Sequence, residues 1–224
     1  MQDNDRGTII GRRSFGKGLV QEPVMFRDGS GMRLTIARYY TPTGRSIQKP
    51  YNEGVEKYYE DLTNRLLHGE FEEADSIRMD DSLQYTTPGG KVVYGGGGIM
   101  PDIFIPIDTT GVTNYFLAIR NSGLIYRYAL KFTEDKRDVM NKYHDLASLD
   151  EWLSGQDLVS KFTKYAEQNG IPPNREQIAV SEKLIYVQLK AYIARNMLDN
   201  KGFYPLWQQI DKTLLVAFDY IENN

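Results

Sequence analysis

The stretch Thr8-Ile-Ile-Gly-Arg-Arg-Ser-Phe-Gly-Lys-Gly-Leu-Val-Gln21 places a single lysine, Lys17, between two glycines directly after a short apolar run. Gly16 and Gly18 add no side-chain bulk and permit backbone dihedrals that other residues avoid, so other backbone can approach the lysine closely. Such crowding removes water from the amine and disfavours its charged form, as a lysine requires to act as a general base near neutral pH. We therefore expect Lys17 to be the centre of a catalytic site.

Gln21 follows Lys17 by four residues. If the segment is extended, the two-residue period of a strand puts Lys17, Leu19 and Gln21 on one face, where the Gln21 amide can orient the amine. Pro23 and the β-favouring residues around it favour a strand over a helix. The candidate catalytic residues are thus Lys17 and Gln21.

The same letters also allow a phosphate-binding loop, because residues 11–18 fit the pattern G-x-x-x-x-G-K. Such a loop needs Ser or Thr after the lysine to bind magnesium, and Gly18 stands there. It must also open a helix, whereas residues 19–26 favour a strand that contains Pro23. Nucleotide binding is the less favoured alternative.

Around this stretch, β-favouring residues predict three strands, at residues 8–11, 18–26 and 32–40. The glycine-rich connection at residues 27–31 predicts a hairpin between the second and the third strand. Residues 41–44, with the sequence T-P-T-G, then form a turn.

Residues 55–69 carry apolar side chains at helical spacing and charged side chains on the other face, which predicts an amphipathic helix. The acidic residues 70–75 lack the spacing of a calcium loop, so we expect a solvated face and no metal site. We assign residues 52–91 to an insertion. Short strands are expected at residues 92–94 and 103–107, and the intervening glycines 95–98 are either a flexible loop or a place where backbone approaches a substrate.

From residue 112 onward the apolar residues recur at helical spacing, so this half is expected to be entirely helical. Asn174 and Gln177 resemble a capping box at the start of a long helix. Lys201 and Gly202 are expected to end that helix, and Pro205 to open the last one.

The chain has 224 residues, a formal net charge of −3 and no cysteine. The charge balance gives no reason to expect a nucleic acid or an anionic membrane surface as partner. The absence of cysteine excludes disulfides, thiolate metal sites and a cysteine nucleophile. His68 and His144 are far apart, which excludes an H-E-x-x-H zinc site. The sequence contains no apolar run long enough to span a bilayer, and its polar start is not typical of a signal peptide.

Three motifs together carry a family resemblance. The string S-F-G-K-G-x-V-Q at residues 14–21 resembles the lysine motif of the carboxyl-terminal processing, or tail-specific, serine peptidases. Residues 37–48 resemble the strand and turn after that lysine, and residues 97–103 resemble the closing G-G-I-x-P-D segment. The three motifs occur in the family's order and cover residues 7–108.

The resemblance implies that Lys17 is the base for a serine nucleophile, with Gln21 at the matching second position. In this family the serine and a peptide-binding PDZ domain lie upstream of the lysine, so we expect the catalytic set of this chain to be incomplete. Ser14, three residues before Lys17, is a weak substitute nucleophile and is better explained as a hydrogen bonder at a turn. The resemblance implies no metal and no organic cofactor.

The fold class expected from the resemblance is α/β. Residues 1–108 would be the C-terminal part of a crotonase-like or ClpP-like peptidase core, and residues 109–224 an all-helical domain. Protein or peptide substrates and the cell envelope or periplasm of a bacterium follow from the same resemblance. A homo-oligomer is expected, because a sheet without its upstream strands exposes an edge. The alternative is a fragment that acts as a structural or interaction module without enzymatic activity.

Overall fold

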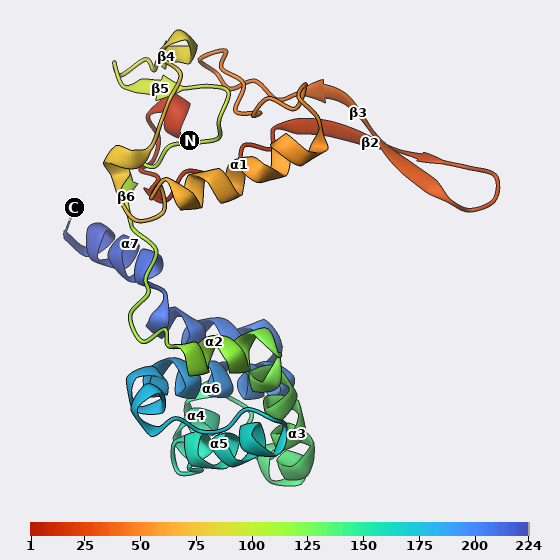
Figure 1. Cartoon of the computed structure of the whole chain (residues 1–224), viewed down its shortest axis with the longest axis vertical. Helices are drawn as coiled ribbons and strands as arrows, with labels where there is room; N and C mark the ends of the chain where they lie inside the picture. The colour runs from red at the N-terminus through yellow and green to blue at the C-terminus, as the bar shows by residue number, and fades with distance from the viewer. Residues whose placement is uncertain (224) are drawn as a thin grey trace. The chain divides into compact units, whose positions relative to one another are not determined.

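The computed structural model describes residues 1–223, and the chain divides into two compact units, unit 1 (Met1–Ile107) and unit 2 (Asp108–Asn224). Strands belong to unit 1, and helices form the described part of unit 2 (Figure 1). The strands and longer helix of unit 1 are β1 (Ile10–Gly11), β2 (Leu19–Met25), β3 (Gly31–Arg38), α1 (Val55–Leu67), β4 (Gln84–Thr86), β5 (Val92–Tyr94) and β6 (Ile103–Phe104). Short 3₁₀ helices lie at Gln2–Asn4, Ala74–Ser76 and Asp81–Leu83.

The strands of unit 1 pair as three small sheets. β1 pairs in parallel with β6, whereas β2 with β3 and β4 with β5 are antiparallel. The predicted hairpin is confirmed, and it extends as a long twisted ribbon away from the rest of unit 1 (Figure 1). The strand predicted at residues 103–107 is shorter than expected, since β6 ends at Phe104, and β4 was not predicted.

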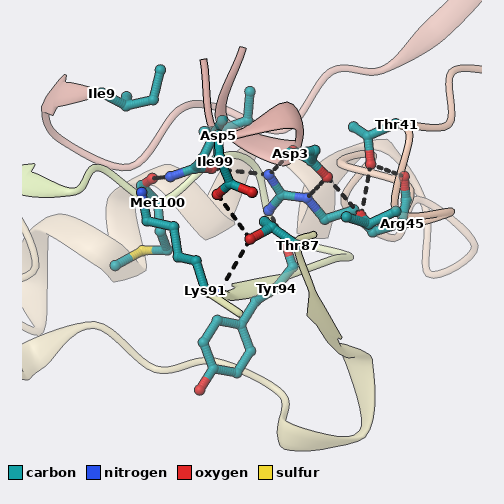
Figure 2. Close-up of polar contacts among 12 residues, drawn as sticks. Asp3, Asp5, Ile9, Thr41, Arg45, Thr87, Lys91, Tyr94, Ile99 and Met100 are labelled. Carbon is teal, nitrogen blue, oxygen red and sulfur yellow. Dashed lines mark hydrogen bonds and ion pairs between the residues drawn. The ribbon is translucent and has the colours of Figure 1, made fainter. Parts of the chain in front are cut away.

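Polar side chains hold unit 1 together where apolar ones are few. In its described part the buried hydrophobic residues are Val93 and Ile105, while Arg45 is completely buried. The Arg45 guanidinium donates to both Asp3 carboxylate oxygens, at 2.6 and 2.9 Å, and to the Tyr94 carbonyl at 2.7 Å (Figure 2). This network ties the first residues of the chain to Arg45, just after the turn at residues 41–44, and to the end of β5.

Unit 2 is organised around one long helix. Its helices are α2 (Asn114–Asn121), α3 (Leu124–Met140), α4 (Leu146–Ser154), α5 (Leu158–Gln168), α6 (Arg175–Trp207) and α7 (Lys212–Asn223), with a 3₁₀ turn at Gln208–Ile210. α6 packs against α2, α3, α4 and α5. The completely buried core side chains include Ile119, Leu149, Leu153, Phe162, Ile185, Leu189 and Ile193. This arrangement explains why the apolar residues of this half recur at helical spacing.

Two sequence predictions about α6 need correction. Asn174 does cap the helix, because its Oδ1 accepts from the Gln177 N–H at 3.0 Å, but the Gln177 side chain instead accepts from the Tyr115 N–H. The capping box is therefore only half formed. The second error concerns the end of the helix. The chain leaves helical geometry at Asp199 (φ 52°, ψ −142°) and then resumes a helix that contains Pro205, so Pro205 does not open α7.

Candidate active site

The loop between β1 and β2 carries Lys17, and its glycines allow the close approach of backbone that the sequence predicted. Gly16 has a positive φ of 85°, and a Cβ there would lie only 3.0 Å from the Gly98 nitrogen. A Cβ on Gly18 would lie 2.9 Å from the Ile47 side chain. Larger residues at either position would push these neighbours away.

The three motifs meet around this loop. The Gly18 N–H donates to the Gln48 Oε1 at 2.8 Å, and the Lys49 N–H donates to the Gly16 carbonyl at 2.9 Å. From the third motif, the Gly98 N–H donates to the Ile47 carbonyl at 2.9 Å. Segments that lie 30 or more residues apart in sequence thus form one backbone assembly around Lys17.

Ser14 takes part in the same assembly. Its Oγ accepts from the Ile99 N–H at 2.8 Å, and its own N–H donates to the Ile99 carbonyl at 3.0 Å. A Cβ on Gly98 would lie 2.3 Å from the Ser14 carbonyl oxygen, so this glycine serves close packing of backbone against backbone. The hydrogen-bonding role predicted for Ser14 is confirmed.

Asp102, in the third motif, anchors β1 to β6. Its carboxylate accepts from the Ile9 N–H and the Gln2 amide, both at 2.8 Å, and pairs with Lys91 at 2.6 Å. Burial raises the pKa of Asp102, but the hydrogen bonds from Lys91, Ile9 and Gln2 lower it by more, so the net pKa lies below its ordinary value. Asp102 is thus an ionised structural residue that positions the start of the lysine loop.

Lys17 and Gln21 line one hollow of about 300 Å³, together with Leu19 and residues of α1. The predicted shared face of these side chains is therefore confirmed. Lys17 is exposed in this structure, whereas the sequence led us to expect a desolvated amine. The Gln21 amide donates to the Thr35 hydroxyl at 3.2 Å, and its role in orienting Lys17 stays a prediction. Gln21 lies in β2, which has a β-bulge between Val20 and Gln21.

The far wall of the hollow comes from α1, and no local sequence pattern predicts that α1 lies beside Lys17. Tyr58 packs edge-on against Phe15, with 5.5 Å between ring centroids. The buried Lys49 ammonium lies over both rings, at 4.1 and 4.2 Å from their centroids, and donates to the Tyr58 carbonyl and to Asp61. These contacts fix the first turns of α1 beside the lysine loop.

The last turn of α1 is fastened to the loop as well. The buried Arg65 donates to the Arg13 carbonyl at 2.8 Å and to the Ser14 carbonyl at 3.3 Å. Glu70 pairs with Arg65 at 2.7 Å and with Arg13 at 2.6 Å. The acidic stretch at residues 70–75, expected to be a solvated face, therefore contributes one buried carboxylate. Helical periodicity cannot predict this carboxylate, because it carries no information about the pairing of Glu70 with Arg13, 57 residues earlier in the chain.

The phosphate-loop alternative is wrong, because the segment after Lys17 is the strand β2 and not a helix whose N-terminus could face an anion. Among the residues that the structure describes, no group of three His, Asp or Glu side chains is arranged to hold a metal ion. Within residues 1–223, no helix is both long and apolar enough to cross a membrane.

Comparison with known families gives one partial match in each unit. The family model described as "Peptidase family S41" matches residues 1–60. Residues 1–60 are thus similar to peptidase family S41. This family consists of serine peptidases, which are hydrolases. A second model, described as a family of unknown function (DUF8443), matches residues 115–199 in unit 2.

The relatives agree with this similarity. The chain is 53% identical over 49 residues to a C-terminal processing peptidase, chloroplastic, of Tetradesmus obliquus, and 54% identical over 48 residues to a carboxy-terminal-processing protease of Bartonella bacilliformis. These segments cover 22% and 21% of this chain and 11% of each relative. The carboxy-terminal processing protease CtpB of Bacillus subtilis is 44% identical over 48 residues, which cover 21% of this chain and 9% of that protein. No solved structure gives a significant match.

Proposed function

We propose that this chain is the lysine-bearing part of a carboxyl-terminal processing serine peptidase, with Lys17 as general base and Gln21 as the residue that orients its amine. One observation carries the proposal: the three motif segments assemble around Lys17, which shares a hollow with Gln21. Unit 1 then forms the C-terminal part of a crotonase-like or ClpP-like core, with residues 52–91 as an insertion. Its substrates are proteins cleaved near their C-termini in a bacterial envelope or periplasm.

The reaction follows from the chemistry of a Ser-Lys pair. The neutral Lys17 amine takes the proton of a serine hydroxyl, and the serine oxygen attacks a peptide carbonyl. The Lys17 ammonium then gives this proton to the leaving amine. Water hydrolyses the acyl-enzyme, which releases the carboxylic acid product and restores the serine hydroxyl. We assign Ser14 a structural role instead, because its Oγ accepts from the Ile99 N–H and its own N–H donates to the Ile99 carbonyl. The proposed serine belongs to polypeptide outside these 224 residues. When that polypeptide packs beside Lys17, it removes water from the amine, which is exposed in this structure.

The base role is tested in the native gene product that contains this chain. Lys17→Arg keeps a positive charge but removes the base, because an arginine does not deprotonate in proteins. We expect kcat/KM on an unfolded protein substrate to fall by about 10²–10⁴-fold. The matched control is Lys57→Arg, at an exposed lysine that pairs with Glu53. A fully active Lys17→Arg enzyme would show that Lys17 is not the base.

The chain of 224 residues by itself is expected to be inactive. It is incubated with unfolded protein and with a serine-directed fluorophosphonate, and cleavage and labelling are both measured. Cleavage accompanied by labelling at Ser14 would contradict the proposal that the nucleophile lies elsewhere. If the native gene product is inactive too, the alternative of a structural or interaction module gains support, which the exposed apolar side chains of β2 and β3 favour.

A further inference from the structure

The hollow beside Lys17, here called the α1 hollow, is lined mostly by apolar side chains. The role of Lys17 as a base does not by itself require such a lining. Lys17 is the single charged residue among those that line it, and Gln21 adds an amide. The other lining side chains are aromatic or aliphatic and come from both walls: Phe15, Leu19, Tyr51, Val55, Tyr58 and Tyr59. A polar reaction centre thus adjoins an apolar surface.

This surface is open to an incoming group. Tyr59 is 63% exposed and Val55 is 74% exposed, although both lie on α1, which Lys49 and Arg65 fasten to the lysine loop. The wall is therefore fixed in place while its apolar atoms face water. Burying apolar surface against such a wall is favourable by roughly 25 cal/mol per Å².

The size of the hollow limits what it can hold. Its volume of about 300 Å³ lies at the lower end of the range of ligand pockets, roughly 300–1,000 Å³. A single amino-acid side chain with its backbone suits this space better than a cofactor. An acidic side chain suits it poorly, because a carboxylate would lose water against the aromatic rings.

We propose that the α1 hollow is a specificity subsite that takes one apolar side chain, of the size of leucine or phenylalanine, from the protein substrate beside the bond that is cleaved. This inference rests on the proposed function for the position of the cleaved bond. Tyr59 and Val55 determine the preference, and Lys17 lies within the same hollow.

The binding preference is measured on the chain itself, without catalysis. Two capped peptides, acetyl-Ala-Ala-Leu-Ala-Ala-amide and its counterpart with Asp in place of Leu, are titrated into the ¹⁵N-labelled chain and followed by NMR. We expect the leucine peptide to bind at least about tenfold more tightly, with shifts at amides of the lysine loop and of the start of α1. Tyr59→Ser reduces this ratio, whereas Leu66→Ser, at another exposed position of α1 outside the hollow, leaves it unchanged.

Equal affinity for the two peptides, tighter binding of the aspartate peptide, or shifts confined to other parts of the chain would overturn the subsite. Cleavage by the native gene product gives an independent readout. If Lys17→Arg abolishes cleavage but Tyr59→Ser leaves the sequence preference unchanged, the subsite fails and the peptidase function stands. If the leucine peptide binds in the predicted place but the native gene product cleaves nothing, the peptidase function fails and the apolar site stands.

Discussion

At the scale of single residues, the stability of unit 1 depends on a buried ion pair. Arg45 has no exposed surface, and Asp3 accepts from it through both carboxylate oxygens. Removing one partner of such a pair leaves an uncompensated buried charge, which costs about 3–5 kcal/mol. We expect Asp3→Asn to lower the free energy of unfolding of unit 1 by this order, measured by urea titration. Glu53→Gln, at an exposed pair, is the control and should change little.

The same pair predicts a pH dependence. Burial raises the pKa of Asp3, but hydrogen bonds from Arg45, Thr41 and Thr43 lower it by more, so the net pKa lies far below its ordinary value of 3.8. Unfolding therefore takes up a proton at acidic pH. The pair contributes its full stability above about pH 3.8 and loses it as the pH falls further. Urea titrations between pH 5 and pH 2 should show a steeper loss for the parent chain than for Asp3→Asn, and parallel curves would contradict this assignment.

Residue patterns predicted some parts of the site and not others. The two-residue period of a strand was enough to predict that Lys17, Leu19 and Gln21 share a face, and all three line one hollow. The catalytic role of Lys17 and Gln21 stays a prediction. The wall formed by Tyr58 and Tyr59 was missed, because a helical period identifies the face of a helix but not what that face contacts. Arg45 and Asp3 were missed for a related reason, since 42 residues separate them and no local pattern records their contact.

At the scale of elements, periodicity and turn chemistry predicted α1 and the β2–β3 hairpin because both are stabilised by neighbours in sequence. The end of α6 was not predicted. Gly202 and Pro205 are ordinary helix-ending signals, yet the break occurs at Asp199. Packing explains the difference, because the short helical segment after the break approaches the part of α6 before it at Ala194, and a glycine at position 202 allows that approach.

Gly202 therefore carries the prediction for this element. A Cβ there would lie 2.4 Å from the Ala194 carbonyl oxygen, which is backbone and cannot move aside cheaply. We expect Gly202→Ala to lower the free energy of unfolding of unit 2 by about 1–3 kcal/mol, despite the better helix propensity of alanine. Thermal unfolding followed by circular dichroism measures the effect. Gly155→Ala is the matched control, since its Cβ would meet nothing closer than 3.6 Å.

At the scale of the whole molecule, the two units differ in what holds them together. Unit 2 has a large apolar core, whereas the described part of unit 1 buries Val93 and Ile105 and relies on polar contacts. We expect unit 1 to unfold at lower urea concentration than unit 2. Both tryptophans, Trp152 and Trp207, report on unit 2, and hydrogen exchange of the β4 and β5 amides reports on unit 1. Coincident transitions by the two probes would show that the units unfold as one.

The hairpin formed by β2 and β3 predicts how whole chains interact. Its register places Met32 opposite Val24 and Leu34 opposite Glu22, so that Met32, Leu34 and Ile36 follow one another on one face of β3. All three are more than 45% exposed. An alternation of this kind belongs to a strand with one buried face, and a two-stranded ribbon also leaves both edges unpaired.

A second copy of the chain can cover this face, because a formal net charge of −3 gives only weak repulsion between copies. We therefore expect the weight-average mass from static light scattering to rise with concentration in the micromolar range. The double variant Leu34→Lys with Ile36→Lys should remain monomeric, since two ammonium groups would have to lose water in the interface. Thr35→Lys adds one such charge to the opposite face of β3 and should associate like the parent chain. A parent chain that stays monomeric at millimolar concentration, or equal association of all three proteins, would contradict an interface on this face.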